Sequence, residues 1–301
     1  KANLTYPNDI DILTLLGMTY LQLKDPERAE IYFKQVLDVY PESEEGISNL
    51  ARSKMLSGEY QSAIDALLSI KDNKIDNTQI KLLLIDSYEK SKSFDKAISV
   101  ALELTQQFPQ ESFFQQKLGV LYGWNNQMIA ARAAFNKALA LDNTNLLAIV
   151  HLARMDIIEN KTENARTFLS EKLKEFPKNP LIMAEMSDSF LFENNTTDAL
   201  LWIEKSYAQA QDDYYILTKY VNILVLMDQL TKATELVDLY IGQSASSLEA
   251  LTLIATLYQR QNQHEQAILA LRDYVRKSVD KSSAYNILAK AQLAAGDNAS
   301  A

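Results

Sequence analysis

Apolar residues recur at spacings of three and four along nearly the whole chain, as in the segments LTLLGMTYLQL and LEALTLIATLYQR. This spacing places the apolar side chains on one face of an α-helix. Runs with the alternation of a β-strand are scarce, and the 301 residues include only seven glycines and six prolines. The pattern therefore predicts an all-α protein.

The helical pattern repeats itself every 34 residues. Stepping by 34 from Ala29 reaches an alanine every time, with no insertion or deletion. The alanines are Ala29, Ala63, Ala97, Ala131, Ala165, Ala199, Ala233, Ala267 and Ala301. A strict period of this length, with two amphipathic stretches in each unit, predicts a tandem array of helix pairs.

Other positions in the period constrain how the two helices of a pair pack. Twelve residues before each alanine the side chain is mostly small, as at Gly119, and four residues after it the side chain is mostly large, as at Phe135. We expect Gly119 and Ala131 to lie where the two helix backbones cross. Tyr122 and Phe135 are then expected to fill the wedge that opens away from this crossing.

The turn inside each unit has its own signature, five residues before the alanine. The residues at this position are Lys24, Gly58, Lys92, Asn126, Asn160, Asn194, Asp228, Asn262 and Gly296. Gly, Asn and Asp tolerate the left-handed backbone conformation that ends a helix. Seven of these nine residues are therefore of a type that favours this conformation directly after a helix, and the two lysines are not.

A 34-residue period with a Leu-Gly pair, a Tyr, an Ala, a Phe and a closing Pro resembles the tetratricopeptide repeat. The resemblance implies a right-handed α-solenoid superhelix of tandem antiparallel helix pairs. It implies repeats over residues 10–301, with units starting near 10, 44, 78, 112, 146, 180, 214 and 248 and a partial ninth from 282. Pro7 marks residues 1–9 as the tail of a preceding repeat, so we expect the chain to be part of a longer array.

Composition and motifs argue against catalysis and against several partners. The net charge of −9 is unlike that of a nucleic-acid-binding protein, and no apolar run is long enough to span a bilayer. There is no cysteine, no Gly-rich phosphate loop and no HExxH motif, and the two histidines lie far apart in the sequence. We therefore expect no catalytic residue, no cofactor and no metal site.

The resemblance also implies that the first helices of the pairs line a concave groove where partners bind. Positions two, five, nine and twelve of each unit lie on one helical face and are expected to point into it. Together with the adjacent His151, the candidate binding residues are Phe113, Gln116, Val120, Leu147, Val150, His151, Arg154, Leu181, Asp188, Tyr215, Thr218 and Asn222. In the first two units the same positions hold Asp11, Thr14, Met18, Leu21, Glu45, Ser48, Arg52 and Met55.

We expect this groove to take an extended or helical peptide through apolar anchors and one or two charged contacts. The alternative is that the apolar side chains pack between neighbouring helices and bind nothing. No unit has lysine at position five, so the resemblance does not extend to the repeats that clamp the C-terminal carboxylate of chaperones.

These features predict a non-catalytic protein-protein interaction scaffold. Two alternatives are a regulatory or substrate-presenting arm of an enzyme whose catalytic domain lies outside this sequence, and a self-associating module. The segments ARAAFNKALALDNTNLLAIVHLARMDIIENKTENAR and FPKNPLIMAEMSDSF also resemble repeat lipoproteins of bacterial exosortase (PEP-CTERM) and exopolysaccharide-export systems. That resemblance implies a scaffold in the bacterial periplasm or anchored to the outer membrane; the cytoplasm is the alternative.

Overall fold

The computed structural model describes residues 9–70, 77–243 and 247–296. In these ranges the chain forms seventeen α-helices and no β-strand. The chain divides into two compact units, residues 1–148 and 149–301. The expectations for Pro7 and Ala301 lie outside the described residues.

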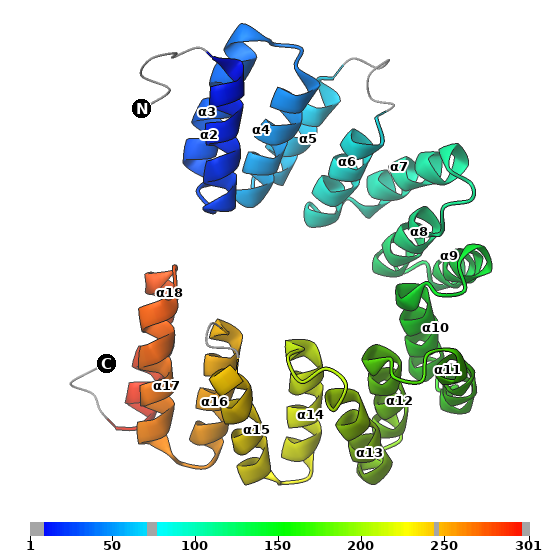
Figure 1. Ribbon diagram of the computed structural model, residues 1–301, viewed down its shortest axis with the longest axis vertical. Helices are drawn as coiled ribbons and strands as arrows, with labels where there is room; N and C mark the ends of the chain where they lie inside the picture. Colours follow the sequence, from blue (N-terminus) through cyan, green and yellow to red (C-terminus); the bar gives the residue numbers. More distant parts are fainter. Residues whose placement is uncertain (1–8, 71–76, 244–246, 297–301) are drawn as a thin grey trace. The chain divides into compact units, whose positions relative to one another are not determined.

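The helices of the first unit follow one another in antiparallel pairs (Figure 1). They are α2 (Ile10–Gln22), α3 (Pro26–Val39), α4 (Glu44–Leu56), α5 (Tyr60–Leu68), α6 (Thr78–Lys90), α7 (Phe94–Gln107), α8 (Ser112–Trp124) and α9 (Met128–Leu141). Each second helix of a pair also packs against the first helix of the next, so that α3 contacts α4, α5 contacts α6, and α7 contacts α8. Each pair therefore buries apolar surface that it could not cover alone.

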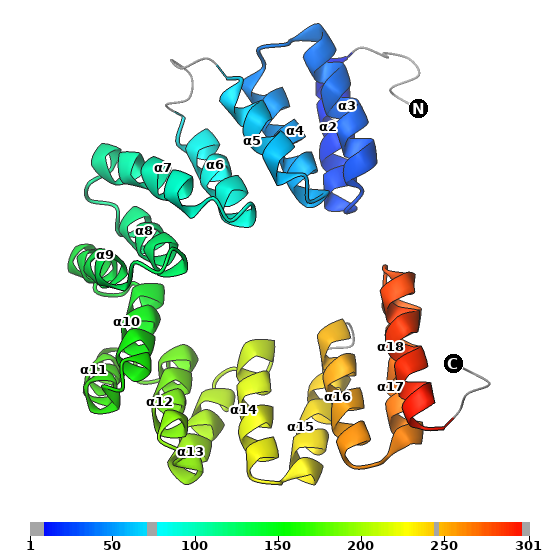
Figure 2. The same cartoon turned by 180° about the vertical axis from the view of Figure 1, so that it is seen from behind.

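The second unit has the same construction, which the reverse view also shows (Figure 2). It holds most of α10 (Leu146–Ile158), whose first three residues belong to the first unit. Its other helices are α11 (Thr162–Glu175), α12 (Pro180–Phe192), α13 (Thr196–Tyr207), α14 (Tyr214–Leu226), α15 (Leu230–Gln243), α16 (Leu248–Arg260), α17 (His264–Lys277) and α18 (Lys281–Ala294). Contacts of α11 with α12, α13 with α14, and α15 with α16 again join successive pairs. The prediction of an all-α solenoid of helix pairs is confirmed.

The repeated alanines are packing positions. All those within the described residues, from Ala29 to Ala267, are at most 1% exposed. The residues four positions later are buried as well, including Phe33, Leu67 and Phe135. In the α12–α13 pair the hydroxyl of Ser187 donates a hydrogen bond of 2.7 Å to the carbonyl oxygen of Ala199. The two helix backbones therefore approach closely at the alanine, as the sequence predicts.

The prediction that Phe135 lies in a wedge away from the helix crossing is wrong. A Cβ atom added at Gly119 would lie 2.7 Å from Cδ1 of Phe135, and one added at Gly17 would lie 2.5 Å from Cε1 of Phe33. The aromatic ring therefore occupies the space that the missing side chain of the glycine leaves, on the crossing itself. Other pairs divide the volume differently at these two positions, with Ala153 and Leu169 in one pair, for example.

The turns within the pairs all have the same backbone conformation. All nine predicted turn residues have a positive φ, including Lys24 at 56° and Lys92 at 59°, which the sequence did not favour. The amide of the following residue donates to a carbonyl in the last turn of the first helix, as from Gln127 to Tyr122 at 2.8 Å. This is the Schellman motif, which ends the first helix and sets the direction of the second.

Candidate functional site

Among the described residues, no group of three or more His, Asp or Glu side chains could hold a metal ion. Within the same ranges, none of the helices combines the length and the apolar character that a bilayer span requires. The resemblance to the tetratricopeptide repeat predicts a partner-binding surface where the first helices of consecutive pairs, the even-numbered helices of each unit, face solvent. We call this surface the first-helix face.

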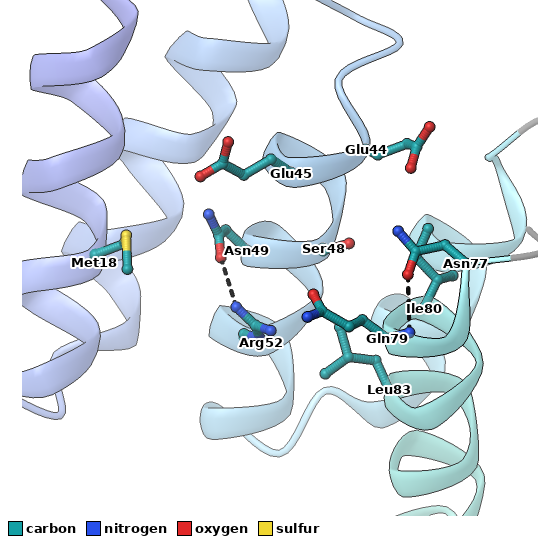
Figure 3. Close-up of a pocket in the computed structure, with 10 residues that line it drawn as sticks. All are labelled: Met18, Glu44, Glu45, Ser48, Asn49, Arg52, Asn77, Gln79, Ile80 and Leu83. Atoms are coloured by element: carbon teal, nitrogen blue, oxygen red, sulfur yellow. Dashed lines mark hydrogen bonds between the residues drawn. The ribbon is translucent and has the colours of Figure 1, made fainter. Parts of the chain in front are cut away.

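The first unit has a pocket of about 360 Å³ on this face. It lies between α2, α4 and α6, and its lining side chains come from these helices and from Asn77, the N-cap of α6 (Figure 3). The lining residues are Met18, Glu44, Glu45, Ser48, Asn49, Arg52, Asn77, Gln79, Ile80 and Leu83. Four of them, Met18, Glu45, Ser48 and Arg52, are residues that the sequence placed on the inner surface.

Polar side chains in this pocket are held in place by neighbours. Nη1 of Arg52 donates a hydrogen bond of 3.1 Å to Oδ1 of Asn49, whose side chain is buried. Oδ1 of Asn77 accepts the backbone amide of Gln79 at 2.9 Å, which caps α6. The pocket therefore offers an exposed guanidinium at one end and the exposed carboxylate of Glu45 near the start of α4.

The second unit has an apolar pocket of about 340 Å³ between α10 and α12. It is lined by Arg154, Ile157, Ile158, Asp188, Leu191 and Phe192. Ile158 is 76% exposed and Phe192 is 47% exposed, so both present apolar surface to solvent. Sequence reasoning missed these two residues because they stand at position thirteen. That position lies one turn beyond position nine, and it is apolar in four successive pairs, at Trp124, Ile158, Phe192 and Leu226.

Three candidate residues of the second unit belong to one charged network. Nε of Arg154 donates to Oε2 of Glu185 at 2.8 Å, and Nη2 of Arg154 donates to the hydroxyl of Tyr215. Asp188 forms an ion pair with Lys219. Arg154 and Asp188, which the sequence nominated as contacts for a ligand, therefore already have partners within the chain.

The partners Glu185 and Lys219 were missed although the sequence contains a signal for them. Each lies 31 residues after the residue it pairs with, so that position nine of one first helix meets position six of the next. The same step joins Asp86 to Lys117 in the first unit, at 3.0 Å. Periodicity within one helix does not show this relation, because it arises between neighbouring helices.

Burial dominates the protonation behaviour of this network. Desolvation raises the pKa of Glu185 more than the hydrogen bonds from Arg154 lower it. The nearby His151 has a pKa below its usual value, first because of burial and second because of the positive charge of Arg154. His151 is therefore neutral at neutral pH.

The other candidate residues differ in how much surface they offer. Gln116 and Val150 are buried, which fits the alternative that these side chains pack between neighbouring helices and do not contact a ligand. Phe113, Leu147, Tyr215 and Asn222 are exposed, and Val120, Leu181 and Thr218 are half-buried. Phe113, Gln116, Val120 and Leu147 belong to the first unit, and the other eight candidates belong to the second.

Comparison with known proteins finds tetratricopeptide repeats in both sequence and structure. Two family models described as tetratricopeptide repeat match residues 10–43 and 252–301. A crystal structure of a tetratricopeptide repeat protein from Parabacteroides merdae has a TM-score of 0.57 and 15% identity, over 94% of this chain and 98% of that one. No curated protein sequence matches the chain at significant similarity.

Two further solved structures are similar at lower scores. MamA from Desulfovibrio magneticus has a TM-score of 0.49 and 18% identity, over 55% of this chain and 93% of that chain. The C-terminal part of a repeat-containing protein from Cytophaga hutchinsonii has a TM-score of 0.46 and 14% identity, over 78% and 97%.

Proposed function

Because this chain is a tetratricopeptide repeat protein, we propose that it is a non-catalytic scaffold that binds a segment of another protein on its first-helix face. Tetratricopeptide repeats generally mediate protein–protein interaction. The resemblance of residues 131–166 to lipoproteins of bacterial export systems supports a partner that belongs to a larger bacterial assembly.

The observation that carries this proposal is the exposed apolar surface of the first helices. Ile158 and Phe192 line one pocket and Met18 lines the other, and the three side chains are 76%, 47% and 42% exposed although their helices pack on neighbours. Grouped apolar side chains that are rimmed by polar groups mark sites of protein interaction. Such side chains take the apolar anchors of a bound segment, and the neighbouring charges fix its register.

The test compares matched substitutions on a first helix and on a second helix within each unit. Met18 on α2 is 42% exposed and Ile31 on α3 is 54% exposed. In the second unit, Ile158 on α10 is 76% exposed and Leu239 on α15 is 54% exposed. Each is replaced by aspartate in the whole protein. Met18→Asp and Ile158→Asp are expected to reduce partner binding by about tenfold or more, because a carboxylate must lose water in the apolar contact.

Binding is measured by quantitative pull-down from cells that produce the protein, and circular dichroism checks that each variant is folded. Ile31→Asp and Leu239→Asp are the controls and are expected to bind like the unchanged protein. Binding that falls only in these two controls would place the partner on the second helices and overturn the proposal.

A further inference from the structure

Three of the five charged residues at position nine of the first helices share one arrangement. Asp86, Arg154 and Asp188 stand at this position, and each forms an ion pair with a residue of opposite charge 31 residues later. Those partners are Lys117, Glu185 and Lys219. Pairing of this kind neutralises the charges of the first-helix face from within.

Arg52 does not share this arrangement. It stands at position nine of α4, but the residue 31 positions later is Leu83, which is apolar. The hydrogen bond of its guanidinium is to the neutral amide of Asn49, and none of the described carboxylates forms an ion pair with it. Arg52 is exposed and lines the pocket of the first unit, next to Leu83 and Gln79 (Figure 3).

We propose that Arg52 receives its carboxylate from the partner, as an Asp or Glu side chain of an extended segment that lies in the pocket of α2, α4 and α6. This inference rests on the proposed function and specifies the chemistry of the bound segment. A guanidinium that a neighbour orients in advance is well suited to a carboxylate, because its parallel N–H groups match the two oxygens. The buried amide of Asn49 gives Arg52 this orientation.

The other end of the pocket has the opposite charge. Glu45 is exposed on the same helix, seven residues before Arg52. Seven residues of α-helix span roughly 10 Å, which an extended segment covers in about three residues. The segment is therefore expected to carry an acidic side chain opposite Arg52 and a basic side chain three residues away opposite Glu45. Glu44 and Glu45 together disfavour a segment of uniformly negative charge.

The test uses an array of synthetic peptides with blocked ends that carry an acidic and a basic residue three positions apart in both orders. Control peptides replace the acid with glutamine, replace the base with glutamine, or carry a free C-terminal carboxylate without an acidic side chain. Fluorescence anisotropy measures the affinity of the whole protein for selected peptides. Peptides with both charges are expected to bind about ten- to a hundredfold more tightly than those without the acid, and less tightly as salt rises.

Three variants assign this preference to Arg52. Arg52→Gln is expected to lose it, and Lys137→Gln, which removes one exposed positive charge from α9 of the same unit, is expected to keep it. Leu83→Glu places a carboxylate 31 residues after Arg52, as Glu185 lies 31 residues after Arg154. This variant is expected to lose the preference for the acidic peptide, because the new carboxylate forms an ion pair with Arg52 inside the protein.

Two results would overturn the inference and leave the proposed function standing: peptides that bind equally well without the acid, or a preference for the acid that persists in Arg52→Gln. A preference for the free C-terminal carboxylate would also overturn it. If no peptide of the array binds at all, the inference fails, and the matched aspartate variants then decide separately whether the first-helix face binds a protein.

Discussion

Replacing Arg154 with methionine is expected to lower the free energy of unfolding by about 3–5 kcal/mol, because it leaves the carboxylate of Glu185 buried and unpaired. Glu185 is 0% exposed, and two hydrogen bonds from the guanidinium of Arg154 hold its carboxylate. The measurement is denaturant unfolding of the whole protein followed by circular dichroism.

The matched control is the double variant Arg154→Met, Glu185→Met. Removing both charges leaves two apolar side chains of similar length, which is expected to restore most of the lost stability. Glu185→Met alone is expected to cost less than Arg154→Met, because the side chain of Arg154 is 38% exposed and can reach water. A double variant as unstable as Arg154→Met would show that the ion pair is not the cause.

The cost of Arg154→Met also depends on pH. Burial already raises the pKa of Glu185, and removal of Arg154 is expected to raise it further. A carboxyl group whose pKa is higher in the folded state contributes stability below its unfolded pKa, and this contribution is lost as pH rises through the folded pKa. The difference between Arg154→Met and the unchanged protein is therefore expected to be largest at neutral pH and to shrink in mild acid. A difference that is the same at both pH values would contradict this account of Glu185.

Replacing Gly119 with alanine is expected to destabilise the first unit by about 1–3 kcal/mol, although alanine favours helix more than glycine does. The new methyl group would lie 2.7 Å from the ring of Phe135, so the α8–α9 crossing must open. Gly123 on the same helix is the control, since nothing lies within 4 Å of a Cβ atom added there. Gly123→Ala is expected to stabilise by about 0.5–1 kcal/mol.

A second substitution tests whether the ring is the cause. In the variant Phe135→Leu, the further change Gly119→Ala recreates the pair that Ala153 and Leu169 form elsewhere in the chain. The cost of Gly119→Ala is expected to be smaller in that background, and a double-mutant cycle from thermal melts measures the difference. An equal cost in both backgrounds would mean that the ring of Phe135 does not limit the crossing.

The fold could be predicted from the sequence because a strict period reports packing. An alanine stands at every step of 34 residues, as at Ala131, because each helix crossing allows only a small side chain there. The conformation of Lys92 could not be predicted, because lysine has no preference for a positive φ. The Schellman hydrogen bonds of the repeated turn impose that conformation on it. The position of the Phe135 ring was not predicted. The sequence shows that residue 119 is small and residue 135 is large, but it does not show that the ring fills the space beside Gly119.

The candidate site could be predicted only in part. Arg52 and Arg154, both at position nine, line pockets on the first helices, yet the two differ in what surrounds them. Arg154 meets Glu185 of the next pair, whereas the corresponding neighbour of Arg52 is Leu83. A reading of one helix at a time cannot separate a charge that holds the fold together from a charge that is open to a partner. The step of 31 residues separates them.

The central claim is that a partner protein lies against the first helices. Site-specific photo-crosslinking tests it most directly, with a photoreactive phenylalanine placed at Ser48 on α4 or Phe192 on α12, and at Ile31 on α3 or Leu239 on α15 for comparison. The account predicts cross-links to a partner from Ser48 and Phe192 and none from Ile31 and Leu239. Cross-links that form only from Ile31 and Leu239 would contradict it.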